Sequence, residues 1–270
     1  MKYIQLFENF QDGSHSTILM FGPQGVGKST LSKELSKKLG MSIVESDDVI
    51  DQGDWSSEDT WSKGWSVRKK NEFIGMKKYL SENLGKRVIL DIGGSHGVWD
   101  GAMLKEILDM INDYPNRFLI IPSPNEKKNT EFLRGRLLKR ELGYHTDNIK
   151  YWDAVLSGDE RFGVKFDPSD REEFLERIRL VKSENKFRNM ALSQRNSSKE
   201  RFDSLSKNPE FMVYTNSPDQ KFDFAMNKIE DYSKFFIDTM LQSGVANHVI
   251  YNKDKSSEQL MDEVISKLVL

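Results

Sequence analysis

The sequence predicts an α/β protein, a three-layer sandwich built on a five-stranded parallel sheet. Five short apolar runs, each about as long as a buried strand, alternate with segments whose apolar residues recur at helical spacing. A glycine-rich loop stands between the first apolar run and the first helical segment. Strands that alternate with helices in this way form right-handed βαβ units, so we expect all five strands to run parallel.

The strands and the first helices follow each other in a regular order. The expected strands are residues 16–21, 41–45, 87–91, 117–121 and 248–251. The helix after the first strand places Leu31, Leu35 and Leu39 on one face, and Gly40 is the expected C-terminal cap. The next two helices repeat this spacing with Phe73, Met76, Leu80 and Leu84, and then with Met103, Ile107 and Met110.

The segment after the fifth strand predicts a capped helix. Ser256 and Gln259 have the spacing of a capping box, in which each residue satisfies a backbone N–H group of the other. Leu260, Val264 and Leu268 follow at helical spacing and form the expected buried face.

The composition excludes several classes of protein. The 270 residues carry 40 basic and 42 acidic side chains, and 37% are hydrophobic, which is too high for a disordered chain. A net charge of −2 argues against binding nucleic acid or an anionic membrane over the whole surface. There is no cysteine, so disulfides and thiolate chemistry are excluded. The chain has no apolar run long enough for a membrane span, and MKYIQLFENF lacks the apolar core of a signal peptide, so we expect a cytoplasmic protein.

The glycine-rich loop GPQGVGKST, residues 22–30, matches the pattern G-x-x-x-x-G-K-[ST] between a strand and a helix. Glycines let successive backbone N–H groups approach phosphate oxygens, and the N-terminus of the following helix adds a positive dipole. Lys28 is expected to reach the β- and γ-phosphates, and the Ser29 hydroxyl is expected to bind Mg²⁺. The predicted ATP-binding residues are therefore Gly22, Pro23, Gln24, Gly25, Val26, Gly27, Lys28, Ser29 and Thr30.

Acidic and glycine residues follow the second and third expected strands. Because ligands of parallel sheets bind at the carboxyl ends of the strands, these residues should share one cleft with the glycine-rich loop. Asp91 is expected to hold Mg²⁺ through water, and Glu45 or Asp47 to accept the proton of an attacking hydroxyl. Gly93 and Gly94 would let backbone N–H groups touch a substrate.

Four pieces of the chain, in order, resemble the shikimate kinase branch of the nucleoside-monophosphate-kinase-like P-loop kinases: GPQGVGKST, ESD at 45–47, VILDIGG at 88–94 and EFLRGRLLKR at 131–140. The resemblance implies that Glu45 lies near Mg²⁺ and the attacking hydroxyl, and that Asp47 binds acceptor hydroxyls. It also implies the remaining site residues, which are Gly93 and Gly94 at the acceptor, and Arg134, Arg136 or Arg140 as a clamp on the transferred phosphate from a lid.

The chain also departs from that family. The family has aspartate where this chain has Glu45, and its run of three glycines has Ile92 in the first place here. Arg68 is the counterpart of the family's carboxylate-binding arginine, but it is displaced by about a helical turn. We therefore expect a kinase with an alcohol group as acceptor and a small-molecule substrate other than shikimate. The opening MKYIQLFENF is similar to the starts of tailed-phage proteins, which implies a viral source.

The expected kinase core does not account for the whole chain. We expect an N-terminal extension at 1–14, a core at 15–135 and 226–270, and a mostly helical insertion at 136–225 in the place of the lid. Within the insertion, residues 145–176 carry 9 acidic and 4 basic side chains, and residues 177–201 carry 8 basic and 2 acidic ones. Ser169 and Glu172 predict a capping box, before the apolar residues Phe174, Leu175, Ile178, Val181 and Phe187.

Two other functions are compatible with the same motifs. The basic run 177–201 is consistent with a solvated helix face, but also with a kinase that acts on a 5′ end or a hydroxyl-bearing modified base of a nucleic acid. The second alternative is a nucleotide-binding ATPase module that has no phosphoryl acceptor and uses the insertion to bind a partner.

Overall fold

A computed structural model of the chain describes residues 15–50, 65–93, 101–209 and 229–269. The expected N-terminal extension, 1–14, lies outside this part. The chain divides into two compact units, Gly135–Met212 and the remainder, Met1–Arg134 with Val213–Leu270. In the described part of the chain, no helix has the length and apolar character that a membrane crossing requires.

The first unit is built on a five-stranded sheet. Its strands are β1 (Ile18–Phe21), β2 (Ser42–Glu45), β3 (Val88–Asp91), β4 (Arg117–Ile121) and β5 (His248–Tyr251). They are arranged in the order β2-β3-β1-β4-β5, and every neighbouring pair is parallel. The predicted α/β class and the five-stranded parallel sheet are therefore confirmed.

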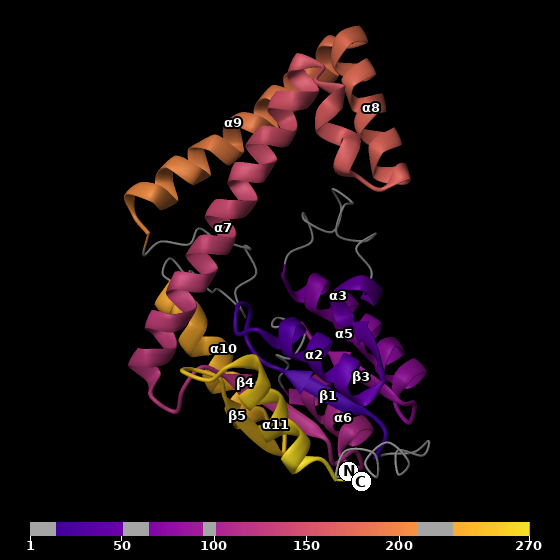
Figure 1. Cartoon of the computed structure of the whole chain (residues 1–270), viewed down its shortest axis with the longest axis vertical. Helices are drawn as coiled ribbons and strands as arrows, with labels where there is room; N and C mark the ends of the chain where they lie inside the picture. Colours follow the sequence, from indigo (N-terminus) through magenta and orange to yellow (C-terminus); the bar gives the residue numbers. More distant parts are fainter. Residues whose placement is uncertain (1–14, 51–64, 94–100, 210–228, 270) are drawn as a thin grey trace. The chain divides into compact units, whose positions relative to one another are not determined.

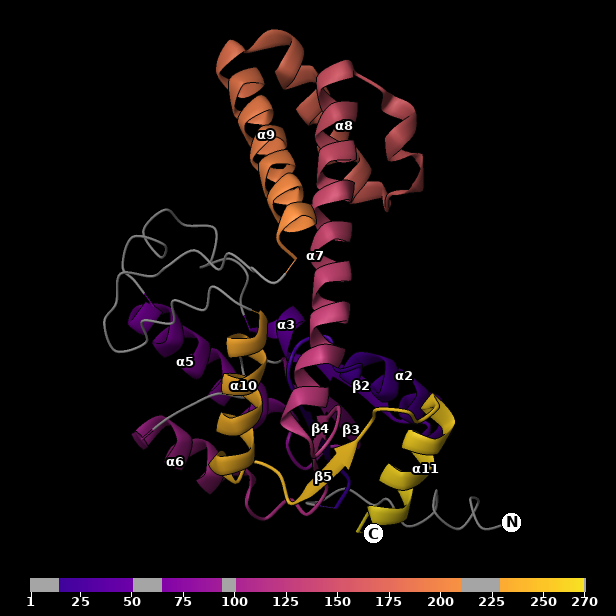
Figure 2. The same ribbon diagram turned by 90° about the vertical axis from the view of Figure 1, so that its left-hand side faces the viewer.

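Helices cover both faces of this sheet, as Figure 2 shows. On one face α2 (Lys28–Leu39) packs against α11 (Ser257–Lys267). On the other face lie α5 (Trp65–Asn83), α6 (Gly101–Ile111) and α10 (Ile229–Ser243), with α5 against α6 and α10 against β4. This distribution is the one that right-handed crossovers produce for this strand order.

The core of the first unit lies between the sheet and these helices. All residues of β1, β3 and β4 are buried, as expected for central strands covered on both faces. Leu31, Leu35 and Leu39 are buried on α2, and Gly40 ends the helix in the left-handed conformation at φ 60°. The predicted face and cap of this helix are thus confirmed.

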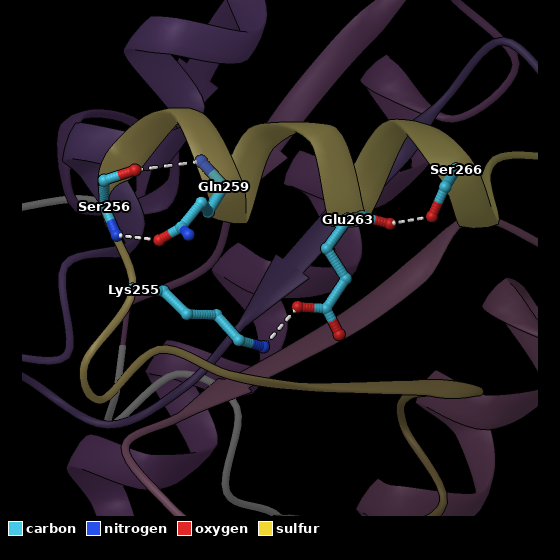
Figure 3. A network of polar contacts seen from close by, with 5 residues as sticks. All are labelled: Lys255, Ser256, Gln259, Glu263 and Ser266. Atoms are coloured by element: carbon cyan, nitrogen blue, oxygen red, sulfur yellow. Dashed lines mark hydrogen bonds and ion pairs between the residues drawn. The ribbon is translucent and has the colours of Figure 1, made fainter.

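Helix α11 begins with the predicted capping box, which Figure 3 shows in detail. The Gln259 N–H donates to Ser256 Oγ at 3.2 Å, and the Ser256 N–H donates to Gln259 Oε1 at 2.8 Å. The buried face consists of Leu260, Val264 and Ile265. Leu268 was predicted to belong to this face, but it lies beyond the helix end at Lys267, where the backbone becomes extended.

The second unit is helical. Helix α7 (Glu126–Ser157) starts in the first unit and continues into the second. It is followed by a 3₁₀ helix η3 (Glu160–Lys165), by α8 (Pro168–Ser183) and by α9 (Asn185–Lys207); Figure 1 labels α7, α8 and α9. Trp152, Val155, Phe174, Ile178 and Val181 form a buried core of this unit, with Tyr151, Phe162, Phe166, Leu175 and Phe187 packed against it.

The start of α8 differs from the prediction. Asp167 is the N-cap, Pro168 is the first helical residue, and Ser169 already lies inside the first turn. The predicted capping box of Ser169 and Glu172 is therefore wrong, because proline is favoured at the first helical position and moves the helix start ahead of the serine.

Candidate functional site

The glycine-rich loop follows β1 in the middle of the sheet and turns into α2. Gly22 has φ 151°, and a Cβ atom at this position would lie 2.4 Å from the carbonyl oxygen of Ile120 on β4. Gly27 is the N-cap of α2 in a left-handed conformation, with φ 97° and ψ 19°. The backbone therefore requires glycine at both of these motif positions, for steric reasons at the first and conformational reasons at the second.

Lys28 is the first residue of α2 and is buried. Its Nζ donates a 2.9 Å hydrogen bond to the Gly22 carbonyl, so the side chain folds back across the loop. A lysine at a helix N-terminus opposes the helix dipole, and the first turn of α2 contains no acidic residue that would offset this. A phosphate group at this position would satisfy both the lysine and the helix N-terminus.

The remaining loop residues line the same turn. Pro23 and Val26 are buried, whereas Gln24, Gly25 and Ser29 are half-buried and Thr30 is exposed. Ser29 is the second residue of α2, next to Lys28, which is where the motif requires a hydroxyl for Mg²⁺.

A residue at the end of β5 holds the loop from the other side. The Asn252 side-chain amide donates to the Val26 carbonyl, and the Asn252 N–H donates to the Ile121 carbonyl at 3.0 Å. Asn252 is buried, so it links β4, β5 and the glycine-rich loop inside the protein.

The predicted acidic residues lie at the same edge of the sheet. In the strand register, Asp91 is paired with Met20 on β1 and with Glu45 on β2. Asp91 is 4% exposed, and its Oδ2 is buried without a hydrogen-bond partner in the described structure. Glu45 is half-buried, and one of its carboxylate oxygens lies 3.9 Å from Lys33 Nζ.

The negative charges of Asp91, Asp47 and Glu45 all affect the pKa of one buried tyrosine, Tyr79. Tyr79 on α5 is fully buried, and its hydroxyl donates to the Val44 carbonyl at 2.6 Å. Burial raises the pKa of Tyr79 far above its usual range, and the negative charges of Asp91, Asp47 and Glu45 raise it further. Asp91, Asp47 and Glu45 therefore each contribute negative charge around Tyr79.

The segment after β2 is also tied to the loop after β3. Ser46, which begins the short helix α3 (Ser46–Val49), is fully buried and accepts a 2.7 Å hydrogen bond from the Gly93 N–H. Asp47, the next residue, is exposed. Gly93 therefore lies beside the acidic segment, whereas Gly94 lies outside the described residues.

The predicted arginines are distributed over two helices. Arg68 belongs to α5, and its side chain lies outside the described part. Arg134 is half-buried on α7 in the first unit, whereas Arg136 and Arg140 are exposed on the part of α7 that belongs to the second unit. Their contact with a transferred phosphate remains a prediction.

The oxygen atoms present fit Mg²⁺ in the way that phosphoryl-transfer sites hold it. Among the described residues there is no group of three or more histidine, aspartate or glutamate side chains placed to hold a metal. Mg²⁺ in phosphoryl-transfer sites takes one or two protein oxygens and completes its shell with water and phosphate. A half-buried Ser29 hydroxyl and the unpartnered Asp91 Oδ2 match that requirement.

A cavity of about 270 Å³ opens at the carboxyl ends of β4 and β5. It is lined by Ile121, Ser123, Asn129, Thr130, Tyr251 and residues of α10. None of the sequence-predicted site residues lines it.

The sequence motifs gave no role to Ser46, Tyr79 or Asn252. Ser46 directly follows β2 and Asn252 directly follows β5, so both lie at strand ends as the predicted acids do. This position is the signal in the sequence that could have identified them. Tyr79 gave no such signal, because it occurs in a helix with an apolar face and its neighbours come from β2.

Comparisons with protein families and with curated proteins identify relatives of this chain. Residues 18–95, which contain the loop and all three acids, match the family described as an AAA domain. Over 82 residues the chain is 37% identical to a shikimate kinase of Actinobacillus pleuropneumoniae, covering 28% of this chain and 44% of that protein. It is 32% identical over 172 residues to the pentafunctional AROM polypeptide of Scheffersomyces stipitis, covering 58% of this chain and 11% of that protein.

Among solved structures, a shikimate kinase from Acinetobacter baumannii in complex with shikimate aligns over 93% of this chain and 90% of its own, with a TM-score of 0.43 and 11% identity. The chain spans less than half the length of the curated relatives named above. The resemblance of the chain to shikimate kinase-like P-loop kinases, which the motifs predicted, is confirmed by the family and sequence matches.

Proposed function

We propose that the chain is an ATP- and Mg²⁺-dependent kinase that transfers the γ-phosphoryl group to a hydroxyl of a small molecule. The observation that carries this proposal is the shared edge of the sheet, where the glycine-rich loop with Lys28 lies beside Asp91 and Glu45. The similarity of the chain to curated shikimate kinases supports phosphoryl transfer to an alcohol.

In this proposal each residue of the edge has a defined task. The loop amides and the N-terminus of α2 bind the phosphates, and Lys28 leaves the Gly22 carbonyl to neutralise charge on the β- and γ-phosphates. Ser29 and Asp91 would hold Mg²⁺, which neutralises phosphate charge when it is bound. Asp91 is suited to this task because its buried oxygen has no other partner in the described structure.

The acceptor side lies toward β2. The acceptor oxygen forms a bond to the γ-phosphorus while the bond from that phosphorus to the β–γ bridging oxygen breaks. Asp47 or Glu45 takes the hydroxyl proton, so the products are ADP and a phosphate ester. Gly93 would touch the acceptor with the rest of its backbone, because its N–H donates to Ser46 Oγ, and Arg134, Arg136 or Arg140 would stabilise the charge on the transferred group.

Replacing Lys28 tests the proposal directly. We expect Lys28→Ala to lower phosphoryl transfer by about 10²–10³-fold or more, because it removes the main cationic group on the γ-phosphate. ATP is supplied with shikimate, sugars, nucleosides, nucleotides, DNA and RNA in turn, and mass spectrometry detects the phosphorylated product. Lys37→Ala is the matched control, since Lys37 is an exposed lysine of the same helix that pairs with Glu34. Wild-type activity in Lys28→Ala would contradict the site assignment.

The same screen separates the kinase from an ATPase module. If ADP accumulates with every candidate and no phosphorylated product is detected, the chain hydrolyses ATP without a phosphoryl acceptor.

The structure offers less support for a nucleic-acid acceptor. Four of the eight basic side chains in 177–201 form ion pairs inside the second unit: Arg177 with Glu173, Arg179 with Glu176, Arg195 with Asp153 and Lys199 with Asp203. These pairs neutralise part of the positive charge locally. We therefore favour the small-molecule acceptor, and binding to DNA or RNA that weakens steeply with salt would reverse this preference.

A further inference from the structure

Ser46 occupies the centre of the acidic segment, but its side chain points away from solvent. The residue is fully buried, whereas Glu45 is half-buried and Asp47 is exposed. A serine between two acids in a phosphoryl-transfer site could contact substrate, but complete burial excludes direct contact in this structure. Its contribution therefore has to pass through the groups that it binds.

Two hydrogen bonds fix the backbone around Ser46. Its Oγ accepts from the Gly93 N–H at 2.7 Å, which joins the end of β2 to the loop after β3. On the preceding side, the Tyr79 hydroxyl donates to the Val44 carbonyl at 2.6 Å, which joins the same segment to α5. Glu45 thus lies between two residues held by buried hydroxyl groups, Val44 and Ser46, and Asp47 directly follows the second.

The strand pairing extends this arrangement. Glu45 is in register with Asp91, and Gly93 follows Asp91 by two residues. The Ser46–Gly93 bond continues the contact between β2 and β3 beyond the last ladder pair. It therefore holds the start of α3, where Asp47 lies, next to the glycine after β3.

We propose that Ser46 is a positioning residue of the acceptor side, which binds the Gly93 N–H and so fixes the loop after β3 against the Glu45–Asp47 segment, whose carboxylates face the acceptor hydroxyl. This inference rests on the proposed kinase function. Ser46 itself makes no contact with substrate and acts through Gly93.

The chain offers a matched control at the opposite edge of the same sheet. Thr17 is also fully buried, and its Oγ1 accepts from the Gly85 N–H at 3.0 Å and donates to the Lys86 carbonyl at 2.9 Å. Thr17 precedes β1, at the edge where the strands begin. Ser46→Ala and Thr17→Val each remove a buried hydroxyl that accepts from a glycine N–H, but only Ser46 lies near the phosphate-binding loop.

The experiment compares the full-length wild type, Ser46→Ala and Thr17→Val. The probes are Mg·ADP for binding, ATP with water as acceptor for basal hydrolysis, and the hydroxyl compound with the highest product yield in the screen above. We expect Ser46→Ala to lower kcat/KM for the acceptor by about tenfold, because residues that orient site groups without touching substrate typically have effects of this size. If the screen finds no acceptor, the rate of basal ATP hydrolysis should fall by about tenfold instead. The Kd for Mg·ADP should change less than twofold, and Thr17→Val should leave all three quantities within twofold of the wild type.

Hydrogen exchange measured by NMR adds a readout that does not depend on activity. The Gly93 amide should exchange at least tenfold faster in Ser46→Ala, and the Gly85 amide should do so in Thr17→Val. Ser46→Thr, which keeps the hydroxyl, should restore slow exchange at Gly93.

The outcomes separate the two proposals. A wild type that fails to bind Mg·ADP would refute the proposed kinase function. If the wild type binds Mg·ADP, two results would overturn the role of Ser46 and leave the kinase proposal in place. The first is an equal loss of activity in Ser46→Ala and Thr17→Val, and the second is no loss of activity in Ser46→Ala. A loss confined to Mg·ADP binding would also overturn the role of Ser46.

Discussion

The sheet-containing unit and the helical unit both carry many charged side chains, but they place them differently. In the first unit Lys28 and Asp91 are buried at the carboxyl edge of the sheet. In the second unit the ion pairs of α8 and α9 are solvent-exposed and mostly join residues three or four positions apart on one helix. Buried charges are costly unless something compensates them, whereas exposed pairs contribute little to stability.

The difference indicates where the chemistry takes place. Under the proposed function, a charged ligand at the N-terminus of α2 would offset part of the cost of holding Lys28 and Asp91 out of water. The exposed pairs of the second unit already satisfy each other. We therefore assign phosphoryl transfer to the first unit.

The cores of the units also differ. The first is formed by mainly aliphatic strands between helices, with Phe21 and Phe118 among them. The second contains an aromatic cluster in which the Phe174 ring centroid lies 5.5 Å from that of Tyr151 and 5.4 Å from that of Phe166. Each unit has a core of its own, so a change in one core should leave the other folded.

Two glycine replacements should give the largest contrast between the units. We expect Gly22→Ala to lower ATP binding and phosphoryl transfer by more than about 100-fold, because the new Cβ would collide with the Ile120 carbonyl and displace the loop. Gly143→Ala in α7 should instead stabilise the second unit by about 0.5–1 kcal/mol, because this exposed helical position has nothing within 4 Å of an added Cβ. Calorimetric titration with Mg·ADP and thermal unfolding measure the two effects, and normal nucleotide binding by Gly22→Ala would contradict the loop geometry.

A pair of phenylalanine replacements tests the independence of the two cores. Phe118 on β4 and Phe174 on α8 are both fully buried, and each change to alanine should cost about 3–5 kcal/mol. We expect hydrogen exchange followed by mass spectrometry to show faster exchange in η3 and α8 for Phe174→Ala, and in β1 and β4 for Phe118→Ala. If either variant speeds hydrogen exchange equally in both units, the two cores are energetically coupled and are not independent.

The smallest effect should be a dependence of the second unit on pH. Burial lowers the pKa of His145, Glu141 opposes this shift and Arg201 adds to it. Because the unfolded state then binds a proton more readily than the folded state, this contribution to stability is complete above about pH 6.5 and is lost as the pH falls below that value. His145→Leu should reduce the loss of stability between pH 7 and pH 5, measured by hydrogen exchange in α9. His248, whose pKa is also lowered by burial, remains as the reference in the first unit.

Much of the first unit could be predicted from local patterns. The β-strands are apolar runs bounded by polar residues or glycine, and the start and end of α2 follow from Gly27 and Gly40. The loop that holds Lys28 was predictable because its spacing and its glycines reflect a backbone requirement that few sequences satisfy. The site residues that were missed, Ser46, Tyr79 and Asn252, act through partners that are 35 to 226 residues away in the chain.

The sequence by itself determined the parallel α/β architecture, the phosphate-binding loop and the acids at the strand ends, because periodicity and glycine spacing are local properties of the chain. Only the tertiary structure decided that Asp91 lies in register with Glu45, that Ser46 binds Gly93 and that α7 continues from one unit into the other. Strand register and buried hydrogen bonds join distant segments, and their partners are selected by the packing of the whole unit rather than by neighbouring residues.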